Sequence, residues 1–329
     1  MTSGPDPPFS LSGGVVAYNE RGRIEGAVRS LLDQALPEGA EWVKLVVVVS
    51  GSTDGTADIV RGMAARDPRI ELVVQPRREG KSAALAEVFA RAQGDYLVLL
   101  NGDARACPGS VRALLEAAAA PCERFAVMGR PVPPTGTPGT FSSAVALLWG
   151  IHNSLHSAVL SDGSGNHLSD ELLLMPVREL PPLGGGIIND GSFVGGWLVQ
   201  NHGELRYAPR ALVSITSPGT FREHVRQRRR IVFGHWQIRD RLAVEPLTIG
   251  RYAWRNPRRA IRLLAGETRR PGGVFALSTL LAGEALAGTL ARIDAGSAGQ
   301  DHVRWPPIRG LSPDAIGESP VGGLSAEGS

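Results

Sequence analysis

From Leu11 to about Gly129, short apolar runs of strand length alternate with longer segments of helical periodicity. This alternation is typical of stacked βαβ units and predicts a mostly parallel sheet. The runs 45–49 and 96–100 are apolar without alternation, so helices should cover both faces of these two strands. We expect strands at 14–17, 43–49, 70–74 and 96–100, and helices at 24–34, from 56 onward, and at 81–92.

The regular pattern fades after Ala120. Beyond a loop rich in Pro and Gly (131–139), we expect a helix at 141–159, a strand at 172–175, two short strand-like segments at 205–207 and 212–215, and a strongly basic helix from 221 to about 241. Both ends of the chain are expected to be disordered. Residues 1–10 are Pro-rich and lack the basic flank and apolar core of a signal peptide, and residues beyond 310 are rich in Gly, Ser and Pro.

The segment Val274–Ile293 is long and apolar enough to raise the question of a membrane span. It carries Glu284 near its middle and several glycines, and a charge at the centre of a bilayer costs roughly 2.5 kcal/mol or more. We therefore reject a span. Two alternatives stay open for this segment, a helix packed on the protein and a helix that lies on a membrane surface.

The composition is that of a globular protein with one large α/β domain and an appendage, since the 329 residues are 43% hydrophobic and 20% charged. Cys107 and Cys122 match no metal or redox spacing, which fits a reducing cytoplasm. A net charge of +3 is too small to indicate a partner, but the charge is unevenly distributed. Five arginines crowd one segment, namely Arg222, Arg226, Arg228, Arg229 and Arg230.

Asn101-Gly102-Asp103 follows the strand that begins at Tyr96, at the kind of sheet edge where open α/β proteins bind ligands. A hard divalent cation prefers oxygen ligands and usually bridges a carboxylate to substrate phosphates. Asp103 therefore suits a complex of a metal with a diphosphate. The alternative is that Asp103 serves only as a helix N-cap before Pro108.

Polar loops follow the other strands as well. Ala17-Tyr18-Asn19-Glu20 places an aromatic ring and an acid where they could stack on a base and accept a ribose hydroxyl. The turn 50–56 leads into a helix whose N–H groups could meet phosphate or base. Plain capping is the alternative for both loops. Glu79-Gly80-Lys81-Ser82 is not a P-loop, because Gln75 stands where the motif requires glycine.

Six motifs in this order and spacing resemble the inverting family 2 glycosyltransferases of the GT-A fold. The first four are Tyr18-Asn19-Glu20, Gly51-Ser52-Thr53-Asp54-Gly55-Thr56, Gly80-Lys81 and Asn101-Gly102-Asp103. Asn189-Asp190 resembles the family's acid pair that carries the catalytic base. Gln227-Arg228-Arg229-Arg230-Ile231 resembles the Gln-x-x-Arg-Trp signature of the cellulose, chitin and hyaluronan synthase branch. The resemblance covers roughly residues 11–234.

The resemblance implies an α/β GT-A fold, that of the nucleotide-diphospho-sugar transferases, with a mostly parallel sheet flanked by helices and a C-terminal helical extension. It also implies a nucleotide-sugar donor, expected to be a UDP-sugar, and Mg²⁺ or Mn²⁺ held by Asp103. Asp190 would be the general base of a single displacement, and Arg230 would stabilise the leaving diphosphate. The donor-binding residues implied by the motifs are Ala17, Tyr18, Glu20, Ser50, Asp54, Lys81, Asn101, Gly102, Gln227 and Arg229.

Four positions, in three places along the chain, depart from the family pattern. Val49-Ser50 stand where family members usually carry an Asp-Asp pair that contacts the base, which weakens the prediction of donor base recognition. Asn101 replaces the first acid of Asp-x-Asp, so one charge fewer should weaken metal affinity. Ile231 replaces the tryptophan of the synthase branch, which makes a processive enzyme less expected than a single transfer to a small-molecule or lipid-linked acceptor.

The basic helix at 221–241 allows three interpretations, a phosphate-binding lid, a membrane-facing patch and a nucleic-acid footprint. We favour the first two together and expect no nucleic acid, because apolar residues recur at helical spacing and one face must be buried. His152, His156 and His167 are interpreted as packing residues, since no carboxylate spacing near them indicates a metal.

We predict four regions: a disordered leader at 1–10, a GT-A catalytic domain at 11–218, a C-terminal helical region with the basic helix at 219–309, and a disordered tail at 310–329. The predicted activity is that of a cytoplasmic glycosyltransferase, with peripheral membrane contact left open. One rival is a catalytically degenerate binding or scaffold subunit. The other, a sugar-nucleotide pyrophosphorylase, would need a Gly-rich loop with a catalytic Arg after the first strand, where Tyr18-Asn19-Glu20 stands instead.

Overall fold

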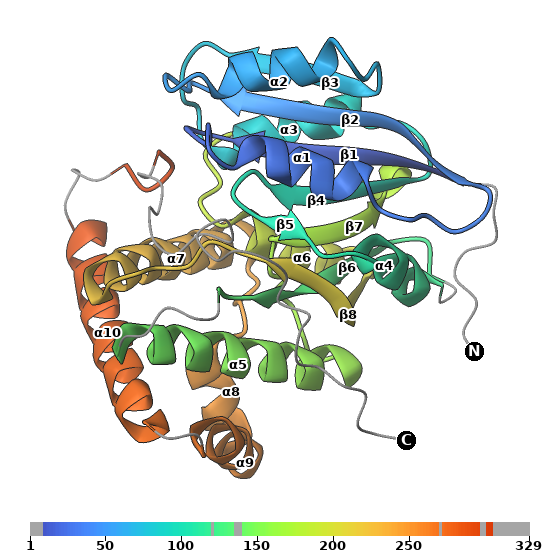
Figure 1. The fold of residues 1–329 in the computed structure, drawn as a ribbon. Coiled ribbons are helices and arrows are strands. Elements are labelled where there is room, and N and C mark those ends of the chain that lie inside the picture. The colour runs from blue at the N-terminus through green and yellow to red at the C-terminus, as the bar shows by residue number, and fades with distance from the viewer. Residues whose placement is uncertain (1–8, 120–121, 135–139, 270–271, 297–300, 305–329) are drawn as a thin grey trace.

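The computed structural model describes residues 9–119, 122–134, 140–269, 272–296 and 301–304. Eight strands form one mixed sheet in the order β3-β2-β1-β4-β7-β6-β8-β5 (Figure 1). The strands are β1 (Phe9–Ala17), β2 (Ala40–Ser50), β3 (Ile70–Gln75), β4 (Tyr96–Asn101), β5 (Arg105–Ala106), β6 (Phe125–Val132), β7 (Leu172–Pro176) and β8 (Glu204–Ser214). Strands β1 to β4 are parallel, as the sequence predicts, and β7 is antiparallel to both β4 and β6.

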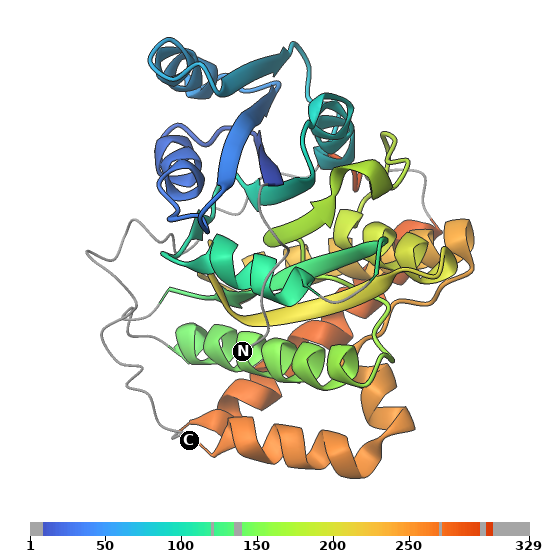
Figure 2. The same cartoon turned by 90° about the vertical axis from the view of Figure 1, so that its right-hand side faces the viewer.

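Helices cover both faces of the sheet (Figure 2). One core lies under α1 (Ile24–Leu32), α2 (Thr56–Ala64) and α4 (Ser110–Ala118), and the other under α3 (Lys81–Arg91), α6 (Asp190–Gln200) and the long α5 (Thr140–Ser161). The strand β2 shows why its run is apolar without alternation. Val47 and Val49 point into the first core, whereas Val46 and Val48 point into the second. The predicted fold class, a mostly parallel α/β sheet flanked by helices with a helical extension, is confirmed.

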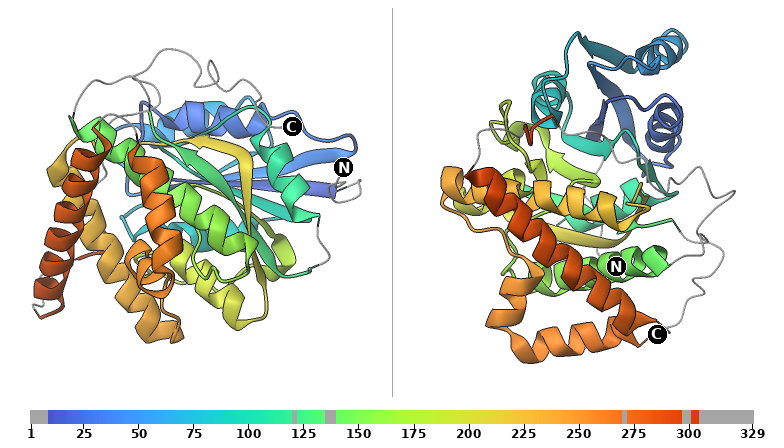
Figure 3. Two further views of the ribbon diagram at one scale, coloured as in Figure 1. Left: turned by 90° about the horizontal axis from the view of Figure 1, so that it is seen from below. Right: turned by 90° about the vertical axis from the view of Figure 1, so that its left-hand side faces the viewer.

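The C-terminal extension consists of α7 (Phe221–Leu242), α8 (Ile249–Arg255), α9 (Pro257–Thr268) and α10 (Gly273–Ala295). In Figure 3, α10 crosses α7 and α5 on one side of the molecule. A small third core joins α5 to α10 through residues such as Leu147, Ile151 and Leu280. The basic helix and the apolar segment predicted from the sequence thus pack against each other.

Several predicted boundaries differ from the structure. The first helix ends at Leu32 instead of Gln34, because Asp33 already has a non-helical conformation. The two segments predicted at 205–207 and 212–215 form one continuous strand, β8, which pairs with β6 on both sides of a register shift between Met128 and Arg130. Phe9 and Ser10 belong to β1 and not to a leader. The predicted tail at 310–329 lies outside the described residues.

Candidate functional site

The loops that follow β1, β2, β3 and β4 meet at one edge of the sheet, because these four strands are parallel. The first two loops are joined by hydrogen bonds. Asn19, which has a positive φ of 56°, receives a bond from Thr53 N at 2.9 Å and donates from its own backbone N to Ser52 Oγ at 2.9 Å. Glu20 N donates to Thr56 Oγ1 at 2.9 Å. The two predicted donor loops are therefore joined into one hydrogen-bonded unit, with Ala17 buried at its base.

Two acids in this unit have structural partners. The carboxylate of Asp54 accepts hydrogen bonds from the backbone N of Thr56 and of Arg21, both at 3.0 Å, which hold it within the turn. The N-cap of α2 is Gly55, which makes no side-chain capping bond. Glu20 is 7% exposed and pairs with Arg23 at 2.6 Å, so the structure does not present Glu20 as an open acceptor for a ribose hydroxyl. Burial, followed by repulsion from Asp103, raises the pKa of Glu20 to about 7.

Tyr18 lies under a guanidinium group. The Cζ atom of Arg78 is 3.8 Å from the centroid of the Tyr18 ring, in cation–π contact. Gly51 allows the loop carrying Arg78 to come this close, because a Cβ atom at Gly51 would lie 2.4 Å from the backbone N of Arg78. Beside it, Ser50 is buried and its Oγ accepts a bond from Glu79 N at 3.4 Å. Arg78 is thus a candidate site residue that the sequence motifs did not identify.

The tripeptide that closes β4 bends sharply back toward β1. Gly102 N donates to Val16 O at 3.0 Å, and a Cβ atom on Gly102 would lie 2.7 Å from that same oxygen, so this position requires glycine. The helix-cap alternative for Asp103 is wrong, because α4 begins at Ser110 and its N-cap is Gly109. Burial raises the pKa of Asp103, and the nearby charges of Arg23 and Lys81 oppose that shift. Asp103 thus lies at the loop edge of the sheet, two residues after the end of β4.

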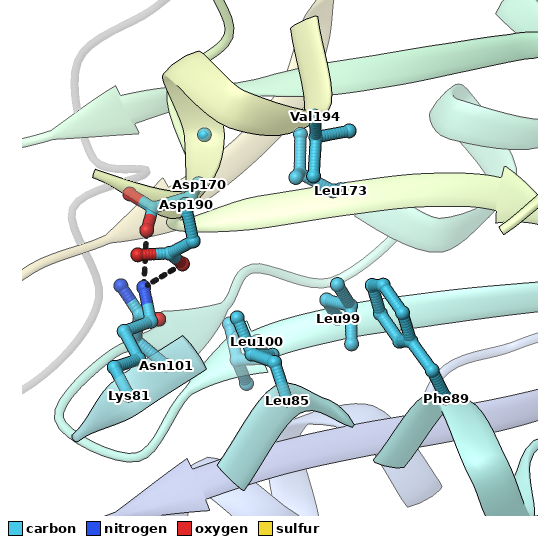
Figure 4. A pocket seen from close by; sticks show the side chains of 11 residues that line it. Lys81, Leu85, Phe89, Leu99, Leu100, Asn101, Asp170, Leu173, Asp190 and Val194 are labelled. Atoms are coloured by element: carbon cyan, nitrogen blue, oxygen red, sulfur yellow. Dashed lines mark hydrogen bonds and ion pairs between the residues drawn. The ribbon is translucent and has the colours of Figure 1, made fainter. Parts of the chain in front are cut away.

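Lys81, the first residue of α3, forms ion pairs with two carboxylates (Figure 4). Its Nζ atom lies 3.0 Å from Oδ2 of Asp190 and also contacts Asp170. The side chain of Asp190 is 5% exposed, whereas those of Lys81 and Asp170 are 23% and 28% exposed. The three polar groups line a cavity together with Asn101 and with apolar side chains of α3, β4 and α6.

Two glycines bring Asp190 to this position. Gly191 lets the start of α6 approach the segment before β7, because a Cβ atom there would lie 2.4 Å from Leu168 O. Gly234 does the same for α7, where a Cβ atom would lie 2.9 Å from the Cβ of Asn189. Asn189 caps α6 by accepting a bond from Ser192 N at 3.1 Å. Asn189-Asp190-Gly191 is therefore a helix start that also delivers a buried carboxylate.

Neighbouring charges shift the pKa values of Asp170 and Asp190 in opposite directions. Burial, followed by repulsion from Asp170, raises the pKa of Asp190 to about 7. Burial also disfavours ionised Asp170, but Lys81 outweighs that effect and holds the pKa of Asp170 below its usual range. Burial disfavours the ammonium of Lys81 as well, and the two carboxylates outweigh this and raise its pKa. Asp190 is therefore the member of the cluster that can take up a proton near neutral pH.

Asp170 and Glu171 belong to none of the six sequence motifs. They reach the site because β7 is antiparallel to β4, which places the residues before β7 beside the end of β4. Glu171 O accepts a bond from Asn101 N at 3.4 Å, and burial together with the charge of Asp170 raises the pKa of Glu171 to about 7. The available signal was the acid pair before an apolar run. It indicates a site only once the strand direction is known.

Arg229 and Arg230, the two arginines predicted to contact the donor, have different partners in the structure. Arg230 Nη2 donates to Ile188 O at 2.8 Å, two residues before Asp190 in the chain, and its charge contributes to lowering the pKa of Asp170. Arg229 is paired with Asp294 of α10, so its predicted role in donor binding gains no support. The cause is helical geometry, because consecutive residues of a helix face different sides. The side chain of Gln227, on α7, is half-buried. A different glutamine of the same helix, Gln237, contacts the loop before α6, because its Oε1 accepts a hydrogen bond from Ile188 N at 2.9 Å.

Four histidines form a row of neighbouring rings, and His167 in this row lies close enough to Asp170 to interact with its charge. His152 and His156 have ring centroids 4.1 Å apart, and the row continues through His167 to His235 at 5.5 and 5.4 Å. Burial lowers the pKa of each of them, to about 3 for His235.

Within the described ranges, no group of three or more His, Cys, Asp or Glu side chains could hold a metal ion. A cation at Asp103 would take most of its ligands from a diphosphate and water, which suits Mg²⁺.

The N-terminal part of the chain is similar in sequence to known proteins. Residues 12–155 match the family described as Glycosyl transferase family 2. TuaG of Bacillus subtilis, named a glycosyltransferase of teichuronic acid biosynthesis, is 38% identical over 87 residues, which cover 26% of this chain and 33% of TuaG. The dolichol-phosphate mannosyltransferase of Saccharomyces cerevisiae is 30% identical over 102 residues, covering 31% and 38%. The matched segment thus spans about a third of the length of these relatives.

Among solved structures, this chain is similar to the mannosyltransferase PcManGT from Pyrobaculum calidifontis, determined in complex with GDP-Man and Mn²⁺. The alignment covers 91% of this chain and 83% of that one, with a TM-score of 0.58 and 20% sequence identity. At this identity the likeness establishes the fold. Neither the family match nor these relatives support the narrower resemblance to the cellulose and chitin synthase branch, so that assignment stays a prediction.

Proposed function

We propose that this chain, which carries a glycosyl transferase family 2 domain at residues 12–155, is an inverting glycosyltransferase. It would move a sugar from a nucleoside diphosphate donor, for which we propose a UDP-sugar, to a hydroxyl of a small-molecule or lipid-linked acceptor. The observation that carries the proposal is the buried carboxylate of Asp190, held by Lys81 at 3.0 Å and given a pKa of about 7 at the loop edge of the sheet.

Asp190 would act as the general base. It accepts the proton of the acceptor hydroxyl while that oxygen forms a bond to the anomeric carbon, and the bond from this carbon to the diphosphate oxygen breaks on the opposite face. Because no protein nucleophile intervenes, the anomeric configuration inverts. A base with a pKa near neutrality is well matched to this proton transfer. Lys81 and Asp170 would position the carboxylate, and Asp170 would remain ionised throughout.

The leaving diphosphate would be stabilised by positive charge from two sides. Arg230 lies beside the start of α6, where its guanidinium can reach a phosphate oxygen with planar, paired donors. Asp103, with Asn101 and the diphosphate itself, would hold Mg²⁺ or Mn²⁺, and this cation would neutralise the charge that develops on the leaving group. Arg78 and Tyr18 would form the platform on the base side of the donor.

We place the protein in the cytoplasm. Both cysteines are free thiols, Cys107 buried and Cys122 half-buried, as expected for a reducing compartment. Ile231 stands at the tryptophan position of the synthase signature, which favours one transfer per donor over chain elongation.

The proposal is tested by incubating the protein with a panel of nucleotide sugars and Mn²⁺ in a thermal-shift assay, followed by donor hydrolysis with and without EDTA. A bound ligand at 100 times its dissociation constant adds roughly 2.7 kcal/mol of stability, which is readily detected. EDTA-sensitive hydrolysis of the donor that binds supports an enzyme. Donor binding without hydrolysis or transfer supports the degenerate binding subunit instead, which Val49-Ser50 and Asn101 would favour.

A further inference from the structure

Large apolar side chains are exposed over the last three helices. In the part of the chain that the structure describes, eleven large hydrophobic residues are exposed, and seven of them belong to α8, α9 and α10. Trp254 is 84% exposed and Val274 is 74% exposed. We call the seven the C-terminal apolar surface, which consists of Trp254, Ile261, Val274, Phe275, Leu281, Leu286 and Ile293.

Five of these residues lie on α10, which has two unlike faces. The inner face is built mostly from small residues at helical spacing, and it packs against α7 and α5. Gly283 allows this contact, because a Cβ atom there would lie 2.9 Å from Cδ2 of His224. Among the described helices, α10 alone is long and apolar enough to cross a membrane, with a mean hydropathy of 1.6, yet only 28% of that stretch is buried. The protein thus leaves most of a strongly apolar helix uncovered.

On the same three helices, acidic side chains contact the body of the protein, and the exposed charged side chains are basic. The three acids between 249 and 295 all have partners toward the body of the protein. Glu267 accepts a bond from Ser154 at 2.8 Å, Glu284 lies 2.5 Å from Arg228, and Asp294 pairs with Arg229. The exposed charged residues are arginines, namely Arg255, Arg258, Arg259, Arg262, Arg269 and Arg292. Of these, Arg259 reaches an acid, Asp162, at 3.4 Å.

We propose that the C-terminal apolar surface, with its exposed arginines, docks on the surface of an anionic phospholipid membrane. Exposed Trp, Phe and aliphatic side chains enter the interface between headgroups and acyl chains, and arginines beside them attract anionic headgroups. The same charge pattern disfavours a second copy of this chain as the occupant, because a symmetric contact would bring arginines against arginines, while the three acids of these helices already have partners toward the body of the protein.

A membrane span by α10 is excluded by its inner face. The pairs Arg228–Glu284 and Arg229–Asp294 tie α10 to α7, and a span would break both pairs and carry two acids into hydrocarbon. The helix therefore lies along the membrane with only its outer face in contact. This docking goes beyond the proposed transfer reaction and does not depend on it.

The test is co-sedimentation of the intact protein with vesicles of phosphatidylcholine alone and of phosphatidylcholine and phosphatidylglycerol in equal parts. We expect binding to the anionic vesicles that weakens as salt is added. The pair of substitutions Arg258→Gln and Arg262→Gln should lower the vesicle affinity roughly 10- to 30-fold, since each basic residue near an anionic surface contributes about a factor of five. Phe275→Ser and Trp254→Ser, both at exposed positions, should each lower it as well.

Matched controls use exposed residues on the opposite part of the molecule. Val74→Ser removes an apolar side chain that is 49% exposed on β3, and Arg66→Gln removes an exposed arginine after α2. Neither should change vesicle binding. Equal binding to both kinds of vesicle, or binding unchanged by the arginine pair, would overturn the proposal. So would a concentration-dependent dimer in sedimentation analysis that Phe275→Ser dissociates, or vesicle attachment that resists alkaline carbonate. Donor binding, measured separately on the same variants, should stay unchanged.

Discussion

The ammonium nitrogen of Lys81, at the start of α3, lies 3.0 Å from Oδ2 of Asp190, at the start of α6. This ion pair joins two helices that lie on the same face of the sheet but far apart in the chain. It holds a buried acid at the loop edge, between a positive charge that favours ionisation and a second acid, Asp170, that opposes it. The chemistry of the site depends on this balance, and each of its parts can be tested.

Replacing Asp190 with Asn tests the general base directly. The variant keeps the shape of the side chain and an oxygen for Lys81 but removes the proton acceptor. We expect turnover to fall roughly 10²- to 10⁴-fold, with donor affinity almost unchanged because the base acts on the acceptor. Glu171→Gln serves as the comparison and should have a much smaller effect. Near-native transfer by Asp190→Asn, or a product that retains the donor's anomeric configuration by NMR, would exclude the proposed mechanism.

The pH dependence of transfer should follow Asp190. Because its pKa is raised to about 7, the carboxyl is protonated and inactive below that pH, and the rate should rise as pH passes through about 7. Lys81 lowers this pKa, so Lys81→Met should move the rising limb to higher pH. The measurement is kcat against pH for both proteins. An unchanged midpoint in Lys81→Met would show that another group controls the profile.

Asp103 should be the principal protein ligand of the cation. Asp103→Ala should abolish Mn²⁺-dependent UDP binding, whereas Asn101→Asp should strengthen Mn²⁺ affinity by restoring a second carboxylate. Isothermal titration calorimetry of UDP with and without Mn²⁺ measures both effects. Asp103→Asn separates loss of charge from loss of volume and should resemble Asp103→Ala. Full Mn²⁺-dependent UDP binding by Asp103→Ala would require another ligand set.

The two neighbouring arginines of α7 provide a matched pair of substitutions. Arg230→Lys loses the planar guanidinium that donates to Ile188 O just before α6, and turnover should fall about tenfold or more. Arg229→Lys should leave turnover nearly unchanged, since Lys can keep an ion pair with Asp294. Neither variant should affect vesicle binding. Steady-state kinetics of both variants would show which arginine supports turnover. A loss of turnover confined to Arg229→Lys would mean that Arg229, and not Arg230, contacts the diphosphate.

Glu20 should make stability depend on pH. Its pKa rises from 4.5 in the unfolded chain to about 7 in the folded one, so between these values the folded state retains a proton that the unfolded state has released. The free energy of unfolding should therefore decrease as pH rises across this window, with a slope from Glu20 of up to about 1.4 kcal/mol per pH unit. Glu20→Gln should remove that part of the slope in urea titrations. An identical slope in the variant would mean that Glu20 is ionised in the folded state.

The sequence alone identifies the first half of the fold and the loops that build the site. Strand lengths, glycines and the unbroken apolar runs 45–49 and 96–100 are local features, and local features determine where strands end and which polar residues follow them. Asp103 and the loop with Asn19 could therefore be placed at the sheet edge without coordinates. The amphipathic pattern of α7 and the apolar composition of α10 were likewise visible.

The tertiary structure alone decides which side chains meet. Lys81 pairs with Asp170 across 89 positions of sequence, and this pair exists only because β7 runs antiparallel to β4, a direction that no local pattern in Leu172–Met175 encodes. Arg229 and Arg230 are adjacent in the sequence, yet one reaches Asp294 and the other Ile188, because the neighbours of a helix face depend on which elements pack there. Charge, burial and pKa at Asp190 follow from those long-range contacts, since electrostatic interactions act through space and not along the chain.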